Sequence, residues 1–248
     1  MLAIIGGSGV AHLANLEETG RRVIRTPYGD PSGALTFGRI SGREVVFLAR
    51  HGYGHTIPPH LVNYRANIWA LHSLPVRSVV AIASVGGIRA DLKPGSLVLP
   101  DQIVDYTHSR KSTFFETSEQ PVTHIDFTFP YTRSLQERCL RAAELAAVPL
   151  TLGGVYGATQ GPRLETAAEI DRLERDGVDM VGMTGMPEAA LAREIGLPYA
   201  AIGVVANYAA GRGDSRDGIR LEELQGTLQA AVGKVKRILD HLVDVDGD

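Results

Sequence analysis

The stretch EVVFLARHGYGHTIPPH, residues 44–60, begins with an apolar run and changes abruptly into a loop rich in histidine, glycine and proline. Such a run predicts a buried strand at 45–49 that ends where the loop begins. The apolar spacing of residues 60–73 then predicts a helix. A strand, a loop and a helix in this order are typical of α/β proteins, in which helices cover a sheet.

The rest of the chain repeats this order. Apolar runs predict further strands at residues 2–5, 78–83, 96–103, 154–158 and 199–206. Helical apolar spacing predicts further helices at residues 134–147, 167–175, 187–195 and 221–242. Residues 106–121 lack periodicity and predict a long excursion. We therefore expect one α/β domain over residues 1–248, a mixed-sheet α/β sandwich with a frayed tail after residue 243.

The composition limits the partners and the location. The 248 residues are 44% hydrophobic and carry a formal net charge of −3, so nucleic acid gains no bulk electrostatic attraction. The single cysteine, Cys139, excludes a disulfide framework and a cysteine-based zinc site. No apolar run is long enough to span a membrane, and the first residues lack the pattern of a signal peptide. We expect a cytoplasmic protein without nucleic-acid or membrane partners.

The loop after residue 49 contains Arg50 and the histidines His51, His55 and His60. A metal site is disfavoured, because glycines and prolines break the helix that would align the histidines and no acidic residue lies among them. A solvated loop is a second alternative. A cradle for an anion or substrate is favoured, because ligands bind at strand carboxyl ends and the arginine fork matches phosphate oxygens.

A second candidate anion site follows the first strand, where the sequence GGSG at residues 6–9 lets backbone N–H groups approach a ligand closely. The lysine of a P-loop is absent, and His12 stands where a dinucleotide fingerprint needs a small residue. Ser8 can still donate its hydroxyl to phosphate. The alternative is a plain turn after a strand.

Three more candidate side chains lie beside predicted element ends. Thr184 precedes the helix that Pro187 opens, and helix N-termini bind anions through free N–H groups. Glu165 directly precedes a helix that a capping box predicts, and the alternative to a functional role is a carboxylate that the helix dipole stabilises. Asn207 ends an apolar strand, where its amide can bind a ligand or form an Asx turn.

Together these stretches resemble the trimeric purine nucleoside phosphorylase / methylthioadenosine phosphorylase family over nearly the whole chain. The motifs that carry the resemblance are GGSG from residue 6, TPYGDPS from 26, RHGYGHTIPPHLVNYRANIWAL from 50, GPRLET from 161 and GMTGMPEAALARE from 182. The resemblance implies a mixed-sheet α/β sandwich that forms a homotrimer. It also implies phosphorolysis of a purine nucleoside to a free base and a pentose 1-phosphate, with phosphate as co-substrate and no metal or organic cofactor.

The same resemblance assigns roles to individual residues. It implies phosphate binding by Ser8, Arg50, His51, Ser84 and Thr184. Ala83 stands where relatives carry a threonine, so that contact would come from backbone or be lost. The resemblance places Met183 against the ribose and His55 near the ribose hydroxyls or the phosphate. His124 resembles a residue that reaches into the 5′ pocket of a neighbouring subunit.

The choice of base is expected to depend on two motifs. Adenine-specific members carry aspartates in a motif like TDYD, whereas members that act on 6-oxopurines carry an asparagine there and a glutamate in a GPxFET-like motif. This chain has Asn207 and Glu165 at those places. As a carboxylate, Glu165 accepts from N1–H of hypoxanthine, and the Asn207 amide donates to O6 and accepts from N7–H. Leu164 replaces the family's stacking phenylalanine and is expected to weaken base binding.

The 5′ end of the nucleoside is expected to meet the last helix. Family members that act on inosine or guanosine place a histidine there, whereas this chain has Leu224, with Leu221 one turn earlier. Two leucines bury a methylthio group but leave a 5′-hydroxyl without a hydrogen-bond partner. The alternative is that both leucines are only core residues of an amphipathic helix.

These features predict phosphorolysis of 5′-methylthioinosine to hypoxanthine and 5-methylthioribose 1-phosphate. The expected catalytic residues are Asn207 and Glu165 at the leaving base and His51 at the phosphate. Three alternatives stay open: a general 6-oxopurine nucleoside phosphorylase for inosine and guanosine, a methylthioadenosine phosphorylase with relaxed base choice, and a non-catalytic nucleotide- or anion-binding protein.

Overall fold

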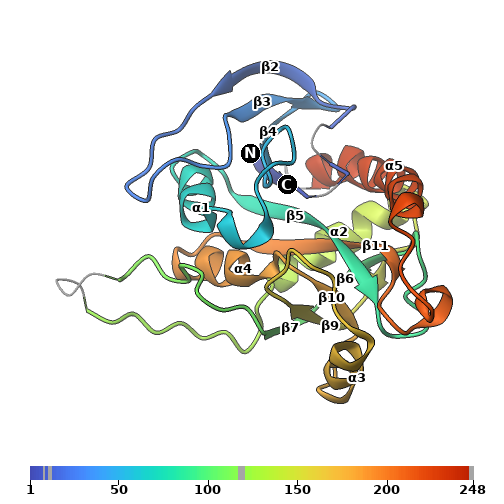
Figure 1. The fold of residues 1–248 in the computed structure, drawn as a ribbon. Helices are drawn as coiled ribbons and strands as arrows, with labels where there is room; N and C mark the ends of the chain where they lie inside the picture. Colours follow the sequence, from blue (N-terminus) through green and yellow to red (C-terminus); the bar gives the residue numbers. More distant parts are fainter. Residues whose placement is uncertain (8, 11–12, 117–120, 246–248) are drawn as a thin grey trace.

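The computed structural model describes residues 1–7, 9–10, 13–116 and 121–245, apart from the side chain of Glu223. These residues form one sheet with helices on both of its faces (Figure 1). The strands are β1 (Leu2–Gly6), β2 (Glu17–Arg22), β3 (Leu35–Ile40), β4 (Arg43–Ala49), β5 (Ser78–Gly87), β6 (Leu97–Leu99), β7 (Gln102–Asp105), β8 (Thr151–Leu152), β9 (Val155–Ala158), β10 (Met180–Gly182) and β11 (Tyr199–Tyr208). The helices are α1 (Tyr64–His72), α2 (Arg133–Leu145), α3 (Ala167–Arg175), α4 (Gly185–Glu194) and α5 (Leu221–Val245), with short 3-10 turns η1 (Pro59–Leu61) and η2 (Gly213–Ser215).

The centre of the sheet is parallel and its outer parts are mixed, which confirms the α/β fold expected from the sequence. β1 lies between β4 and β5 and is parallel to both. The first half of β5 pairs with β1, and its last residues pair antiparallel with β10. Along its other side β5 forms a long parallel ladder with β11. Beyond β5 the sheet therefore continues in two branches, through β10, β9 and β7 and through β11, β6 and β8.

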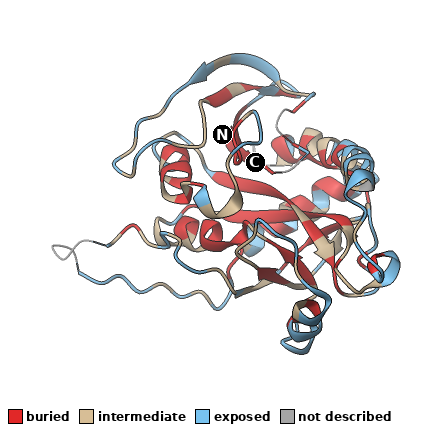
Figure 2. Ribbon diagram, viewed as in Figure 1, coloured by how far each residue is buried: buried red, intermediate tan, exposed pale blue. Residues whose placement is uncertain are grey.

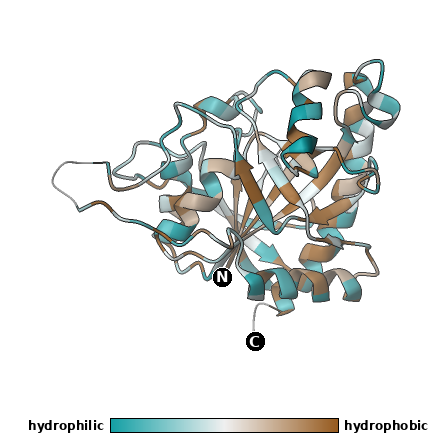
Figure 3. Cartoon of the chain, turned by 90° about the horizontal axis from the view of Figure 1, so that it is seen from below, coloured by the Kyte–Doolittle hydropathy of each residue, from teal (hydrophilic) through white to brown (hydrophobic). Residues whose placement is uncertain are grey.

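Helices cover both faces because the central strands carry apolar side chains on both sides. Ala3 and Ile5 of β1 belong to the core that α1 and α4 cover. Leu2 and Ile4 belong to the core that α2 and α5 cover. Figure 2 shows the central strands buried, and Figure 3 shows apolar residues concentrated on them and on the inner sides of the helices.

Most predicted elements are confirmed, with shifts at their ends. Residues 96–103 form two strands instead of one, because Pro100 and Asp101 separate β6 from β7 and these strands pair with different partners. α1 begins four residues later than predicted, since the two prolines before it lead into a 3-10 turn. Its cap is Asn63, whose side chain accepts from the N–H of Ala66.

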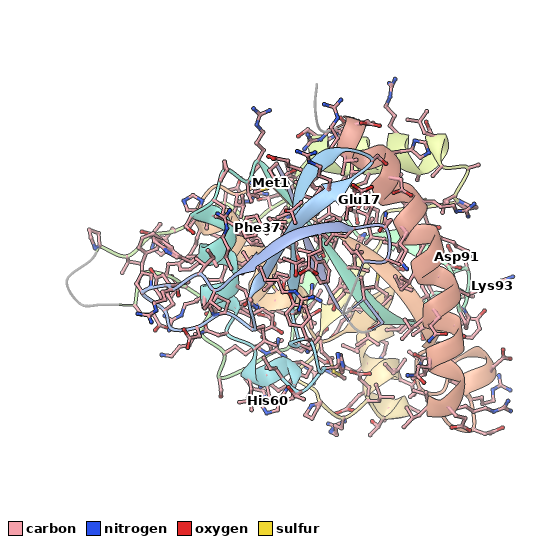
Figure 4. All side chains as sticks on the ribbon, turned by 90° about the horizontal axis from the view of Figure 1, so that it is seen from above. Met1, Glu17, Phe37, His60, Asp91 and Lys93 are labelled. Atoms are coloured by element: carbon pink, nitrogen blue, oxygen red, sulfur yellow. The ribbon has the colours of Figure 1, made fainter. Side chains whose placement is uncertain are left out.

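The sequence pattern does not predict β2, β3 or β8. β2 reads EETGRR and is exposed along most of its length, so no apolar run marks it. It pairs with β3 at the edge of the sheet, on the side that Figure 4 views, where Glu17 and Phe37 are labelled. Between β7 and α2 the chain leaves the body on the left of Figure 1, and the described residues of that segment contain no helix or strand. The predicted excursion is thereby confirmed.

Candidate active site

A cavity of about 550 Å³ opens where several strands of the sheet end. Its walls come from residues after β1 and β4, the last part of β5, the segment after β10 and the end of β11. Ligand sites in open α/β sheets form at such strand ends. The lining residues are Gly7, Arg50, His51, residues 55–59, residues 84–86, Pro162, Leu164, Glu165, residues 181–184, Ala206, Asn207, Ala209, Ile219, Leu224 and Leu228.

Arg50 lines this cavity, and the buried carboxylate of Glu188 holds its side chain in place. Its Nε and Nη2 donate to the two oxygens of Glu188 at 2.7 and 2.8 Å, and Nη1 donates to the carbonyl of Ile82 at 3.0 Å. Burial alone would lower the pKa of Arg50, but the attraction of Glu188 outweighs it and raises the pKa. Within the described structure, these bonds use three of the five N–H groups, so two remain for an anion.

Two residues near Arg50 explain how its guanidinium fits there. A Cβ on Gly7 would lie 2.9 Å from Nη1 of Arg50 and 2.5 Å from the carbonyl oxygen of Ile82, so only glycine leaves room for the side chain. Tyr199 donates its hydroxyl to Glu188 at 2.8 Å and completes the carboxylate's hydrogen bonds. Glu188 is absent from the sequence-based candidates. Its signal is a single carboxylate in the first turn of an otherwise apolar helix segment, MPEAALA.

His51 lies beside Arg50 as a neutral ring. Burial, together with the positive charge of Arg50, lowers the pKa of His51 to about 4. Its Nδ1 lies 2.8 Å from the carbonyl of Ile57, which can only accept, so Nδ1 carries the hydrogen. Nε2 is therefore an acceptor, suited to a phosphate O–H or a sugar hydroxyl. The ring of His55 lies 4.7 Å from that of His51.

The lowered pKa of His51 predicts a pH dependence of stability. Between pH 6.5 and about 4 the unfolded chain binds a proton at this residue and the folded chain does not, so stability is lost as the pH falls through this range. The loss attributable to His51 should be about 2 kcal/mol between pH 7 and 5, and roughly 3 kcal/mol by pH 4. Urea unfolding in phosphate-free buffer at pH 7, 6 and 5 measures it. His51→Gln should show a flatter profile, and parallel profiles for the two proteins would contradict the prediction.

The cavity is also lined by Glu165 and Asn207, the two candidate base-binding residues. Glu165 Oε1 accepts from the hydroxyl of Thr159 at 2.7 Å, and the predicted capping box begins α3 directly after it. The ladder between β5 and β11 contains a bulge that brings Asn207 opposite Gly86. One N–H of the Asn207 amide is donated to the carbonyl of Tyr208 at 2.6 Å, which leaves its oxygen and its second N–H for a ligand.

Most sequence-predicted site residues come together in this one cavity. They are Arg50, His51, His55, Ser84, Leu164, Glu165, Met183, Thr184, Asn207 and Leu224. Thr184 directly precedes α4, whose first turn is interrupted at the non-helical Met186, so the regular helix begins at Pro187, as the sequence predicts. Ser8 lies outside the described residues. His124 is exposed in the excursion between β7 and α2 and does not line the cavity of its own chain.

The prediction for Leu221 is wrong. Its side chain is 64% exposed at the first position of α5 and does not line the cavity. Leu224 and Leu228, four residues apart on one helix face, line the cavity together with Ile219. Ile219, Leu224 and Leu228 therefore form an apolar wall of the cavity, which is the candidate 5′ wall. Within the described residues, no group of three His, Cys, Asp or Glu side chains could hold a metal ion, and no helix is long and apolar enough to cross a membrane.

Comparisons with known proteins show the family and the fold. The family model described as "Phosphorylase superfamily" matches residues 1–244. A protein of Xanthomonas campestris pv. campestris named "Probable S-methyl-5'-thioinosine phosphorylase" is 50% identical over 241 residues, covering 97% of this chain and 96% of that protein. The "6-oxopurine nucleoside phosphorylase" of Pyrococcus furiosus is 46% identical and covers 85% of this chain and 80% of its own. The solved methylthioadenosine phosphorylase of Schistosoma mansoni in complex with adenine superposes with a TM-score of 0.94 at 31% identity, over 99% of this chain and 91% of that one.

Proposed function

The chain belongs to the phosphorylase superfamily, and from this we propose that it cleaves 5′-methylthioinosine with phosphate, giving hypoxanthine and 5-methylthioribose 1-phosphate. The observation that carries the proposal is that one cavity has both a polar end and an apolar end. One end has Glu165 and Asn207, and the other has Ile219, Leu224 and Leu228. The 50% identical relative with a methylthioinosine name supports the same assignment.

Phosphate is proposed to bind between these ends. Arg50 offers its two remaining N–H groups, and Thr184 offers its hydroxyl from the segment just before α4. Ser84 lines the same region, and His51 accepts from a phosphate O–H at Nε2. Ser8 is part of the proposal through the family resemblance. The proposal includes no metal or organic cofactor.

The reaction is proposed to proceed through a stretched glycosidic bond. The C1′–N9 bond breaks with its electron pair moving onto the purine, which leaves positive charge on the ribose, as in glycoside chemistry. A phosphate oxygen then forms the bond to C1′ from the opposite face. N7 of the departing base takes up a proton from water, the Asn207 oxygen accepts a hydrogen bond from the resulting N7–H, and Glu165 accepts one from N1–H. Most of the rate acceleration is expected from positioning and preorganised charges.

The test is an assay of free-base release with and without phosphate, using 5′-methylthioinosine, inosine and 5′-methylthioadenosine side by side. Preference for methylthioinosine would support both assignments, the base recognition by Glu165 and Asn207 and the apolar 5′ wall. Preference for inosine would support the general 6-oxopurine activity that the Pyrococcus furiosus relative favours, and would contradict the apolar 5′ wall. Preference for methylthioadenosine would contradict base recognition by Glu165 and Asn207. Ligand binding without base release would favour the non-catalytic alternative.

A substitution in the 5′ wall should change the preferred sugar. Leu224→His places a hydrogen-bonding group where the wall is now apolar, so the ratio of kcat/KM for inosine over methylthioinosine should rise by about 10- to 100-fold. The matched control is Leu221→His, the same change on the exposed side of the same helix, which should leave the ratio unchanged. Equal ratios in both variants would contradict the assigned wall.

The proposal also includes a homotrimer in the cytoplasm, in which His124 of the neighbouring subunit completes the 5′ pocket. Support comes from the excursion that carries His124. It extends from the body of the protein, and two of its apolar side chains, Val122 and Phe129, are 78% and 70% exposed. Exposed apolar residues of this kind are typical of a protein–protein interface. The molar mass from light scattering would test the assembly.

A further inference from the structure

Arg110 lies in the excursion between β7 and α2 and does not line the cavity, yet its guanidinium contacts two of the loops that do. Nη1 donates to the carbonyls of Met183 at 2.8 Å and Met186 at 2.6 Å. Nη2 donates to the carbonyls of Thr159 at 3.2 Å and Gln160 at 2.9 Å. The guanidinium therefore bridges the loop after β10 and the loop after β9.

The remaining bonds of Arg110 strengthen this bridge. Nε donates to the side-chain oxygen of Gln160 at 3.1 Å. Nη1 also lies 3.4 Å from the hydroxyl of Tyr64, which itself donates to the carbonyl of Pro59 in the histidine loop at 2.9 Å. Every N–H direction of the guanidinium thus meets an oxygen, and the partners are carbonyls and a phenol, not the carboxylate of a surface ion pair.

The two bridged loops carry opposite ends of the substrate site. Met183 and Thr184 line the cavity, and the proposed function places them at the sugar and the phosphate. Thr159 binds Glu165 through its hydroxyl, so the position of its backbone sets the position of the carboxylate at the base side. β9 and β10 pair only as far as Ala158 and Gly182. Thr159 adds a bond from its backbone N–H to the Gly182 carbonyl at 2.8 Å. Beyond that bond, among the described contacts, Arg110 joins the two loops through several hydrogen bonds.

We infer that Arg110 is a positioning residue that fixes the base loop relative to the sugar and phosphate loop. The inference rests on the proposed function, because it deepens the account of the same site. Lysine cannot replace arginine here, since a single ammonium nitrogen cannot reach carbonyls on two loops in the way the planar fork does. A misplacement of about 1 Å between reacting groups is enough to slow an enzyme roughly 100-fold.

The alternative is that Arg110 only fastens the excursion to the body. Hydrogen exchange separates the two ideas. In Arg110→Ala and Arg110→Lys, the amides of residues 159–165 and 182–186 should exchange faster than in the parent protein. Lys111→Ala is the matched control, because this neighbouring cation binds only the excursion's own Glu116, at 3.1 Å among the described contacts, and should leave those amides unchanged. Faster exchange confined to residues 106–116 would overturn the inference.

Kinetics test the functional part on whichever nucleoside the parent cleaves. Arg110→Ala should lose about 100-fold in kcat, while KM for phosphate stays within about threefold because Arg50 and Glu188 are untouched. Millimolar guanidinium chloride should restore a saturable part of kcat to Arg110→Ala, and sodium chloride at equal concentration should not. Unchanged kcat in Arg110→Ala would overturn the inference. A parent without phosphorolysis would instead refute the proposed function, and hydrogen exchange would still decide whether Arg110 joins the loops.

Discussion

Replacing Glu188 with alanine is expected to lower the free energy of unfolding by about 3–5 kcal/mol, because Arg50 keeps its charge in a buried site without a partner. The side chains of Arg50 and Glu188 are 1% and 0% exposed, so the charge of Arg50 is poorly solvated once the carboxylate is gone. The same change releases the guanidinium that we expect to hold phosphate, and kcat/KM should fall by about 100-fold or more. Urea unfolding and steady-state phosphorolysis measure the two effects.

Two further variants make this result interpretable. Glu188→Gln keeps the shape and an oxygen that can accept from Tyr199, so its loss of stability should be smaller than that of alanine. Glu44→Ala removes an exposed glutamate on β4 and should change stability by no more than about 0.5 kcal/mol. If Glu188→Ala unfolds at the same urea concentration as Glu44→Ala, the buried pair does not stabilise the fold.

A second large effect is expected at the base end. Asn207→Asp should lower kcat/KM for 6-oxopurine nucleosides by about 100-fold, because the new carboxylate faces O6 as well as the Tyr208 carbonyl to which the amide now donates. Relative preference should shift toward adenine nucleosides, whose amino group donates to the carboxylate. Base release from methylthioinosine and methylthioadenosine measures the ratio.

The Glu165 carboxylate limits this shift, since it still faces the unprotonated N1 of adenine. The double variant Glu165→Gln with Asn207→Asp should therefore prefer adenine more strongly than the single variant, because the glutamine amide can donate to N1. Asn207→Ala is the control: it removes the contact with either base and should slow both substrates without reversing their order. An unchanged base preference in Asn207→Asp would contradict the assigned recognition.

The sequence predicts the strands of this fold where both faces of the sheet are covered. β1, β4, β5, β9 and β11 are found close to their predicted bounds, because consecutive apolar residues in a soluble protein need burial on two sides. β2 has no such run. It exists because β3 offers it backbone hydrogen-bond partners, and a pairing partner is not visible in local composition.

The candidate site also contains some residues that the sequence predicts and others that it does not. Positions such as Arg50, Thr184 and Asn207 follow from the ends of predicted elements, and the sheet brings those ends together. Glu188 does not follow, because its role depends on Arg50, which lies 138 residues away in the chain. Arg110 is similar: its partners are backbone carbonyls, which every residue has, so no sequence pattern marks them.

In α5, which carries Leu224 and Leu228, the sequence does not predict which apolar residues face the cavity. An apolar repeat predicts that one face of the helix is buried, but the repeat does not set which residue is the first to face inward. Leu221 satisfies the repeat and is exposed, whereas Leu228 satisfies it and lines the cavity. Only the docking of α5 on the sheet decides between them.

The long ladder between β5 and β11 has a consequence for the lifetime of the molecule. It pairs Tyr199 with Val79, 120 residues apart in the chain, and contacts of such long range form slowly during folding. Residues of both strands line the cavity, so a partly folded chain in which they are not yet paired lacks the complete binding site. Phosphate and nucleoside therefore stabilise only the complete molecule, by mass action. Proteolysis, which acts on opened chains, should then be slower when the substrates are plentiful, so that their supply sets how long each copy survives.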